Sequence, residues 1–176
     1  MLFKNKDNLI DQIYQNIVKI SRSKFFYIDY NLEDSFETRF DLIIFHSFMI
    51  FYFYKSKKIN NSNISQSLFD YMFNDFENNL REMGFGDIAV NKKMKIFVRA
   101  FYGRISQYSI GLDKVKNEGD KTLINKTILN NIFKGTTSDP RYVDMFVNYI
   151  INNVDYFESK SEEENIKLNF QFIDFS

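Results

Sequence analysis

The chain has 176 residues, the length of one domain, and its 23 basic and 23 acidic side chains give a formal net charge of zero. A general attraction of the whole molecule to nucleic acid or anionic lipid is therefore not indicated, although a local patch could still bind one of them. The sequence has no Cys and a single His, which excludes disulfides and thiolate metal sites and argues against a His-based metal site.

Aromatic side chains and the scarcity of helix breakers shape the first predictions. The 21 Phe and 11 Tyr side chains must be buried or form a binding surface. One Pro and six Gly favour long helices joined by short turns. The first helix is expected over residues 8–20, where Leu9, Ile13 and Ile17 share one face. Residues 25–28 are expected to form a short turn or an extended piece.

The second helix is predicted over residues 35–55, with Asp34 or Ser35 as its N-terminal cap. Its apolar side chains point in nearly every direction, which is typical of a central buried helix or of one that docks a partner. A polar loop is expected over residues 57–63. The third helix, over residues 65–83, is amphipathic, and Gly84 stands where a helix ends with a positive φ.

The fourth helix is predicted over residues 91–108. Its apolar stripe consists of Met94, Phe97, Val98, Phe101, Ile105 and Tyr108. A polar loop is expected over residues 114–121, followed by a fifth helix over residues 121–134 that Gly135 ends. The sixth helix is predicted from residue 139 to about residue 157, with Pro140 in the first helical position, where its missing N–H costs nothing.

The last segment of the chain changes character. Residues 159–165 are polar and acidic. Apolar and polar residues then alternate from Ile166 to Phe172, a period of two that suits a strand or an extended arm. We expect this arm to fold back onto the helical body, the alternative being contact with a second copy. The prediction is an all-α, single-domain bundle of about six helices with an extended C-terminal arm over residues 159–176.

Signatures of catalysis are absent from the sequence, which has no Gly-rich phosphate loop, no H-E-x-x-H motif and no nucleophile elbow. We therefore predict no enzymatic activity and no cofactor. The N-terminus lacks the apolar run of a signal peptide. The most apolar stretch, residues 42–54, is shorter than the ~20 residues needed to cross a bilayer. The expectation is a soluble, intracellular protein.

Arg39 and His46 form a first polar constellation. They are seven residues apart, so they lie on one side of the otherwise apolar second helix. A buried Arg needs a partner, which would be a bound ligand or a carboxylate of the third helix, with Asp70, Asp75 and Glu82 as candidates. His46 is interpreted as a hydrogen-bonded core residue or, less simply, as a ligand.

The second constellation lies on the fourth helix, on the face opposite its apolar stripe. Its members are Lys92, Lys95, Arg99 and Ser106, with Tyr102 at the border. Lys93 and Arg104 lie to the other side. This face is either an ordinary solvated one, a patch for the phosphates of lipid headgroups or ribosomal RNA, or a surface for an acidic partner.

Four segments between residues 35 and 104 form a pattern of their own. In chain order they are Arg39-Phe40-Asp41-Leu42-Ile43-Ile44-Phe45-His46, Leu68-Phe69-Asp70-Tyr71-Met72-Phe73-Asn74-Asp75, Asn79-Leu80-Arg81-Glu82-Met83-Gly84-Phe85-Gly86-Asp87 and Ala100-Phe101-Tyr102-Gly103-Arg104. Together they resemble the ubiquinol–cytochrome c chaperone family of mitochondria and α-proteobacteria. The order and spacing of all four are far more specific than any one of them. The remaining helices agree only in length and apolar pattern.

The resemblance implies a helical assembly chaperone that escorts newly made cytochrome b into the ubiquinol–cytochrome c reductase, respiratory complex III. Mitochondrial members act with a small partner protein and associate with the ribosome, which makes both candidate partners here. No mitochondrial presequence is visible, and this favours the α-proteobacterial branch. The implied location is the cytoplasm, with peripheral contact at the cytoplasmic face of the inner membrane.

The resemblance and the two constellations together define the candidate client- and partner-binding residues. These are Arg39, His46, Asp70, Asp75, Arg81, Glu82, Asp87, Lys95, Arg99, Tyr102 and Arg104. Gly84 and Gly86 would serve turn geometry, and Gly103 a close approach of two helices. The alternative function is a carrier of a lipid or quinone held between the second, third and fourth helices. An enzyme that uses Arg39, His46 and the carboxylates of the third helix is the least favoured hypothesis.

Overall fold

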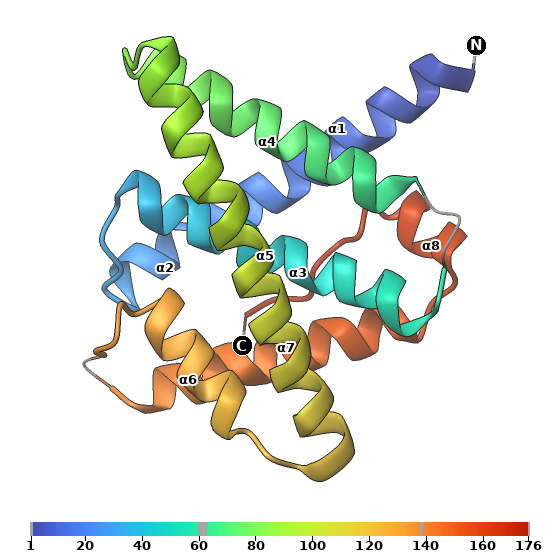
Figure 1. Ribbon diagram of the computed structural model, residues 1–176. Helices are drawn as coiled ribbons and strands as arrows, with labels where there is room; N and C mark the ends of the chain where they lie inside the picture. The colour runs from blue at the N-terminus through green and yellow to red at the C-terminus, as the bar shows by residue number, and fades with distance from the viewer. Residues whose placement is uncertain (1, 60–62, 138, 176) are drawn as a thin grey trace.

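The computed structural model describes residues 2–59, 63–137 and 139–175, and this part of the chain forms helices and loops without any strand (Figure 1). Its eight helices are α1 (Leu2–Ser21), α2 (Lys24–Ile28), α3 (Phe36–Ser56), α4 (Ile64–Glu82), α5 (Asp87–Glu118), α6 (Thr122–Asn131), α7 (Arg141–Glu158) and α8 (Glu162–Lys167). The predicted all-α class is confirmed.

The central element is α3, which contacts α1, α4, α5 and α7. In Figure 1, α5 crosses in front of it. Most of its 21 residues are buried, as its apolar character on every side predicts. The helix begins at the predicted cap, where Ser35 Oγ accepts a hydrogen bond from the Thr38 N–H at 3.2 Å. Among the described residues, no helix is both long enough and apolar enough to span a membrane.

The amphipathic helices α1 and α4 pack against each other. Ile13 and Ile17 of α1 and Leu68 of α4 are fully buried, as their spacing predicts. Past the end of α4, Gly84 adopts a φ of +88°, the left-handed conformation that glycine adopts without steric cost. Gly86 has a φ of −74°, so the turn requires a glycine for its conformation only at the first of the two positions.

The longest helix, α5, extends well beyond its prediction. It begins at Asp87 and continues to Glu118, and Gly119 with a φ of +72° ends it. The predicted end near residue 108 and the predicted loop over residues 114–121 are wrong. Leu112 is fully buried, and the Lys116 Nζ lies 2.6 Å from the Glu158 carboxylate of α7. Tertiary contacts therefore hold this polar end in a helix.

Helices approach each other closely at Gly111, and the prediction for Gly103 is wrong. A Cβ at Gly111 would lie 3.0 Å from the Cβ and 3.1 Å from the Cα of Ile124, so α5 and α6 pack there without an intervening side chain. At the exposed Gly103, a Cβ would meet no atom of the described chain within 4 Å.

Two connecting segments also differ from their predictions. Residues 24–28 form the short helix α2 instead of a turn or extended piece, because the Phe26 ring is buried next to Phe146 of α7, with 5.7 Å between ring centroids. The predicted fifth helix ends early, since α6 stops at Asn131 and Gly135 lies in the following loop. Pro140 directly precedes α7. Residues 60–62 of the predicted loop over 57–63 lie outside the described residues.

The C-terminal segment folds back onto the helical body, the arrangement that the sequence favours. Its first part is the helix α8, which Ser161 and Glu164 stabilise through a reciprocal capping box, so the prediction of extended structure from residue 166 is wrong there. Residues 168–175 form the rest of the arm as the structure describes it. Phe170 is fully buried in the core, and the Asn16 side chain donates hydrogen bonds to the carbonyls of Asn169 and Phe170 at 3.1 and 3.0 Å.

Candidate partner-binding surfaces

Exposed apolar and basic side chains gather in one stripe along α5. We call this stripe the outer face of α5, and it comprises Ile88, Lys92, Lys95, Ile96, Arg99, Tyr102, Ser106 and Ile110. The positions recur every three or four residues and therefore share one side of the helix. Ile88 is 89% exposed, Tyr102 59% and Ile96 54%. The structure thus brings Lys95, Arg99 and Tyr102 together, alongside isoleucines that sequence analysis overlooked.

Arg104 points to the opposite side of α5, toward a buried carboxylate of α3. Its Nη2 lies 2.7 Å from Oδ1 of Asp41, whose side chain is only 2% exposed. The two groups attract each other by charge, but the geometry at Oδ1 of Asp41 is not that of a hydrogen bond. Lys134 Nζ, from the loop after α6, contacts the other oxygen of the same carboxylate. We call these three residues the Asp41 cluster; it joins α3, α5 and the α6–α7 loop.

Burial dominates the electrostatics of the Asp41 cluster. It raises the pKa of the Asp41 carboxyl above its ordinary value, although the charges of Arg104 and Lys134 act in the opposite direction. The candidate Arg104 therefore has a structural partner, and its guanidinium also lies over the Phe40 ring, 5.5 Å from the centroid. Its side chain is 21% exposed, which leaves little of it accessible to another molecule.

Arg39 and His46 do not form a joint site. Arg39 is half exposed and pairs with Asp34 at 2.8 Å, so the predicted pairing with a carboxylate of α4 is wrong. The reason is position, because Arg39 lies in the first turn of α3 at the surface.

His46 is a core residue. It is fully buried, with Nδ1 2.9 Å from Ser21 Oγ and 2.7 Å from the Leu42 carbonyl oxygen. Burial lowers its pKa to about 3, so the ring is neutral near pH 7. A client could reach His46 only if the core opened, which corrects its place among the binding candidates.

The acidic candidates on α4 bind neighbouring parts of the chain. Asp75 accepts a hydrogen bond from the Tyr14 hydroxyl of α1 at 2.7 Å. A second tyrosine crosses in the other direction, since the Tyr71 hydroxyl donates to Asp11 of α1 at 2.7 Å. Asp70 is exposed and accepts from Gln66 one helical turn away. The two tyrosine contacts fix α4 on α1, which gives Asp75 a structural role, whereas the contact of Asp70 lies within α4.

The remaining candidates cluster at the turn between α4 and α5. The Arg81 guanidinium binds Glu77 at 2.7 Å and also contacts Asp87, the first residue of α5. Both Arg81 and Asp87 are exposed, as is Glu82. Arg81 and Asp87 therefore connect α4 to the start of α5 at the surface.

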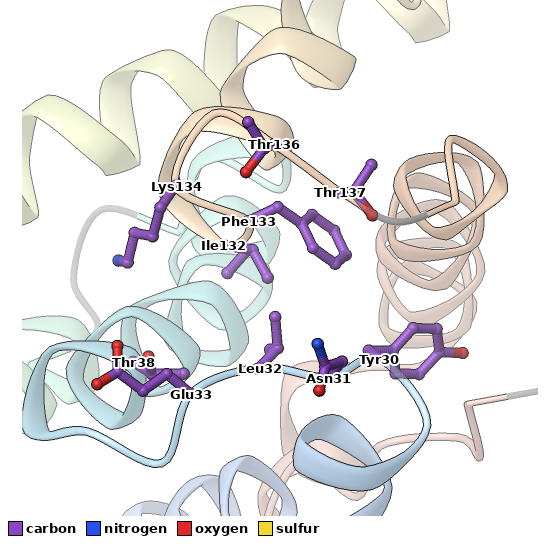
Figure 2. Close-up of a pocket in the computed structure, with 10 residues that line it drawn as sticks. All are labelled: Tyr30, Asn31, Leu32, Glu33, Thr38, Ile132, Phe133, Lys134, Thr136 and Thr137. Atoms are coloured by element: carbon purple, nitrogen blue, oxygen red, sulfur yellow. The ribbon is translucent and has the colours of Figure 1, made fainter.

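Two hollows flank the connection between α2 and α3. The first has a volume of about 450 Å³ and is shown in Figure 2, where residues from this connection face the loop that follows α6. Its lining combines the buried apolar side chains of Leu32, Ile132 and Phe133 with the polar side chains of Thr136 and Thr137.

The second hollow lies beside α2 and has a volume of about 370 Å³. It is lined by Arg22, Lys24, Tyr27, Ile28, Asp34 and Arg39. Ile28 is 72% exposed, and three basic side chains and one carboxylate line the hollow with it. Arg39 is the candidate residue that belongs here. We refer to the two concave regions together as the α2–α3 hollows.

The space between α3, α4 and α5, where the carrier hypothesis places its ligand, is filled with aromatic rings. Phe40 of α3 lies 5.0 Å from Phe76 of α4 and 4.7 Å from Phe97 of α5, measured between centroids. Phe73 and Phe101 pack edge to face at 5.5 Å. A lipid or quinone would have to displace these rings to enter.

Comparison with known protein sequences gives consistent matches. The model of the ubiquinol–cytochrome C chaperone family matches residues 29–172. The mouse ubiquinol-cytochrome c reductase complex assembly factor 1 is 21% identical over 153 residues, and the human protein of the same name 20%. Each alignment covers 87% of this chain and 50% of the relative, so the chain spans about half the length of these curated relatives.

A solved structure is also similar. The crystal structure of the Cbp3 homolog from Brucella abortus matches with a TM-score of 0.77 and 25% sequence identity. The alignment covers 99% of this chain and 96% of that one. The likeness thus extends from the first helix to the C-terminal arm.

Proposed function

Because the chain belongs to the ubiquinol–cytochrome c chaperone family, we propose that it binds newly synthesised cytochrome b and promotes assembly of the ubiquinol–cytochrome c reductase. The match over residues 29–172 is the observation that carries the proposal. Relatives whose names refer to assembly of this reductase, aligned over 87% of the chain, support it. The protein binds this client in the cytoplasm, at the cytoplasmic face of the inner membrane.

The client binds in the α2–α3 hollows. A segment of an unassembled membrane protein is largely apolar, and it is held best by a concave surface with an apolar floor and a few polar anchors. Leu32 and Phe133 supply the floor of the first hollow, and the exposed Ile28 supplies an apolar contact in the second. Arg39 and Lys24 orient the client by binding its acidic or carbonyl groups.

Site-specific cross-linking tests this location. The chain has no Cys, so one introduced Cys carries a maleimide photo-cross-linker at a single position. Ile28→Cys and Thr136→Cys, one in each hollow, should cross-link to cytochrome b fragments made in a cell-free translation system. The matched controls Ile110→Cys and Ser106→Cys lie on α5 and should not. Equal cross-linking from all four positions would contradict the assignment of the hollows.

A genetic experiment tests the function itself. Deleting the gene should lower the amount of assembled ubiquinol–cytochrome c reductase while leaving the other respiratory complexes at their normal levels. Complementation with Ile28→Ser, whose side chain is mostly exposed and whose loss spares the core, should restore assembly only in part. Unchanged reductase levels in the deletion strain would refute the proposed function, whatever the cross-linking shows.

A further inference from the structure

Most of α5 carries charges of a single sign. Between residues 88 and 112 the sequence has no Asp or Glu but five basic side chains, which are Lys92, Lys93, Lys95, Arg99 and Arg104. The carboxylates at the borders of this stretch are already engaged, because Asp87 contacts Arg81 and Asp113 lies 2.7 Å from Lys55. Three of these five, Lys92, Lys95 and Arg99, lie on the outer face of α5, which is therefore a local positive surface in a chain with no net charge.

The same face exposes large apolar side chains between its cations. Ile88, Ile96 and Ile110 are 89%, 54% and 46% exposed, and Tyr102 is 59% exposed. From Ile88 to Ile110 the stripe runs for ~33 Å along a single helix, at about 1.5 Å per residue. Figure 1 shows α5 as one continuous helix across the front of the molecule, so the exposed stripe is long and straight.

A partner of this face must bind its basic side chains and also cover its exposed isoleucines. RNA would attract Lys95 and Arg99 through its phosphates but would gain nothing from burying Ile88. The interface of an anionic bilayer satisfies both sets, because basic side chains bind the headgroups while aliphatic side chains enter the boundary with the acyl chains. Tyrosine is also enriched at this depth of a membrane, which suits Tyr102. A flat, deformable surface can contact such a long, straight stripe along its whole length.

We propose that the outer face of α5 docks the protein on the surface of a bilayer that contains anionic phospholipid. The helix lies parallel to the membrane, with Ile88 and Ile96 inserted at the headgroup boundary and Lys92, Lys95 and Arg99 on the phosphates. No residue of the α2–α3 hollows takes part, so this inference does not depend on the identity of the client.

Co-sedimentation of the full chain with vesicles tests the proposal. Wild-type protein should bind vesicles of phosphatidylcholine mixed with phosphatidylglycerol, should not bind phosphatidylcholine alone, and should dissociate as salt is added. The variant Lys92→Gln/Lys95→Gln/Arg99→Gln should partition roughly a hundredfold more weakly, given the contribution of each basic side chain near an anionic surface. The control Lys19→Gln/Lys24→Gln/Lys126→Gln has the same net charge and should bind like the wild type.

Isoleucine variants separate a membrane from other polyanionic or acidic partners. Ile88→Ser and Ile96→Ser should each weaken vesicle binding roughly tenfold, whereas Ile28→Ser should have no effect, because Ile28 lies on α2 although its 72% exposure falls between theirs. The proposal is overturned if wild-type protein stays in the supernatant with both vesicle types, or if the two charge variants bind equally. Silent isoleucine variants would also overturn it and would assign the face to RNA or an acidic protein. Unchanged circular dichroism and Tm would show that every variant is folded.

Discussion

The ion pair between Arg104 and Asp41 allows a quantitative test of how this core holds a charge. Asp41 is 2% exposed, and Arg104 and Lys134 are its two cationic partners. Arg104→Met retains an unbranched side chain next to Phe40 but leaves the carboxylate with Lys134 alone. Removing one partner from a buried pair costs about 3–5 kcal/mol, and because the half-exposed Lys134 remains, we expect the free energy of unfolding to fall by about 2–3 kcal/mol.

This loss of stability should depend on pH. Burial already raises the pKa of Asp41 in the folded protein, and removing Arg104 raises it further. Between the pKa of the unfolded chain, about 3.9, and the higher pKa of the folded one, the folded state binds more protons. Stability in that window falls as the pH rises. Acidification from about pH 7 into this window should therefore return part of the stability that Arg104→Met loses.

Urea unfolding, followed by circular dichroism at several pH values, measures both effects. Arg99→Met, on the outer face of the same helix, is the matched control and should change the free energy of unfolding by less than about 0.5 kcal/mol. Asp41→Asn/Arg104→Met removes the buried carboxylate as well and should be more stable than Arg104→Met. A loss below about 1 kcal/mol, a loss that is the same at every pH, or a double variant no more stable than the single one would refute the reasoning.

Three further predictions concern packing and protonation. Gly111→Ala places a Cβ 3.0 Å from Ile124 Cβ and should lower the free energy of unfolding in urea by about 1–3 kcal/mol. Gly103→Ala adds its Cβ in open space and should raise that free energy by about 0.5–1 kcal/mol. Equal effects of the two substitutions would contradict the close approach at Gly111. Phe170→Ala removes a fully buried ring and should cost about 3–5 kcal/mol, so an unchanged Tm would show that the arm contributes nothing. Burial lowers the pKa of His46 from 6.5 to about 3, so the folded state binds fewer protons there than the unfolded state. As the pH falls below 6.5, the free energy of unfolding should therefore decrease because of His46, by up to about 1.4 kcal/mol per pH unit. His46→Leu should reduce that slope in urea unfolding, and identical slopes would refute a neutral buried ring.

The sequence predicts the helices whose burial follows from residue spacing. The spacing of apolar residues in α4 shows which side of it is buried, and the apolar residues on every side of α3 show that it is buried all round. Ser35 and Gly84 mark helix ends that local chemistry determines. The end of α5 was not predictable in this way, because Lys116 and the polar residues near it are held by α7. The case of α8 is different. Ser161 and Glu164 form an S-x-x-E capping-box pattern that is visible in the sequence, and that signal was overlooked.

The Asp41 cluster shows where sequence reasoning about the site fails. Arg39 and Asp41 are neighbours on the same apolar helix, and the sequence alone led us to seek a buried partner for Arg39. The helical period separates them, because Asp41 shares its side of α3 with Phe45 and Phe48, which pack near Tyr108 of α5. The second cation, Lys134, comes from a loop far along the chain, so no spacing within α3 could reveal it.

The cations on the outer face of α5 are best explained by a partner, because folding does not require them. Arg104 and Lys116 of the same helix differ, since they pair with Asp41 of α3 and Glu158 of α7. Within the described residues, Lys92, Lys95 and Arg99 have no ion-pair partner, yet they lie three and four residues apart on one side of the helix, an arrangement of like charges that destabilises a helix slightly. Replacing them with neutral side chains would relieve this repulsion and leave every buried contact in place. A membrane surface removes the same repulsion by supplying phosphates, and it also covers the isoleucines that water would otherwise surround.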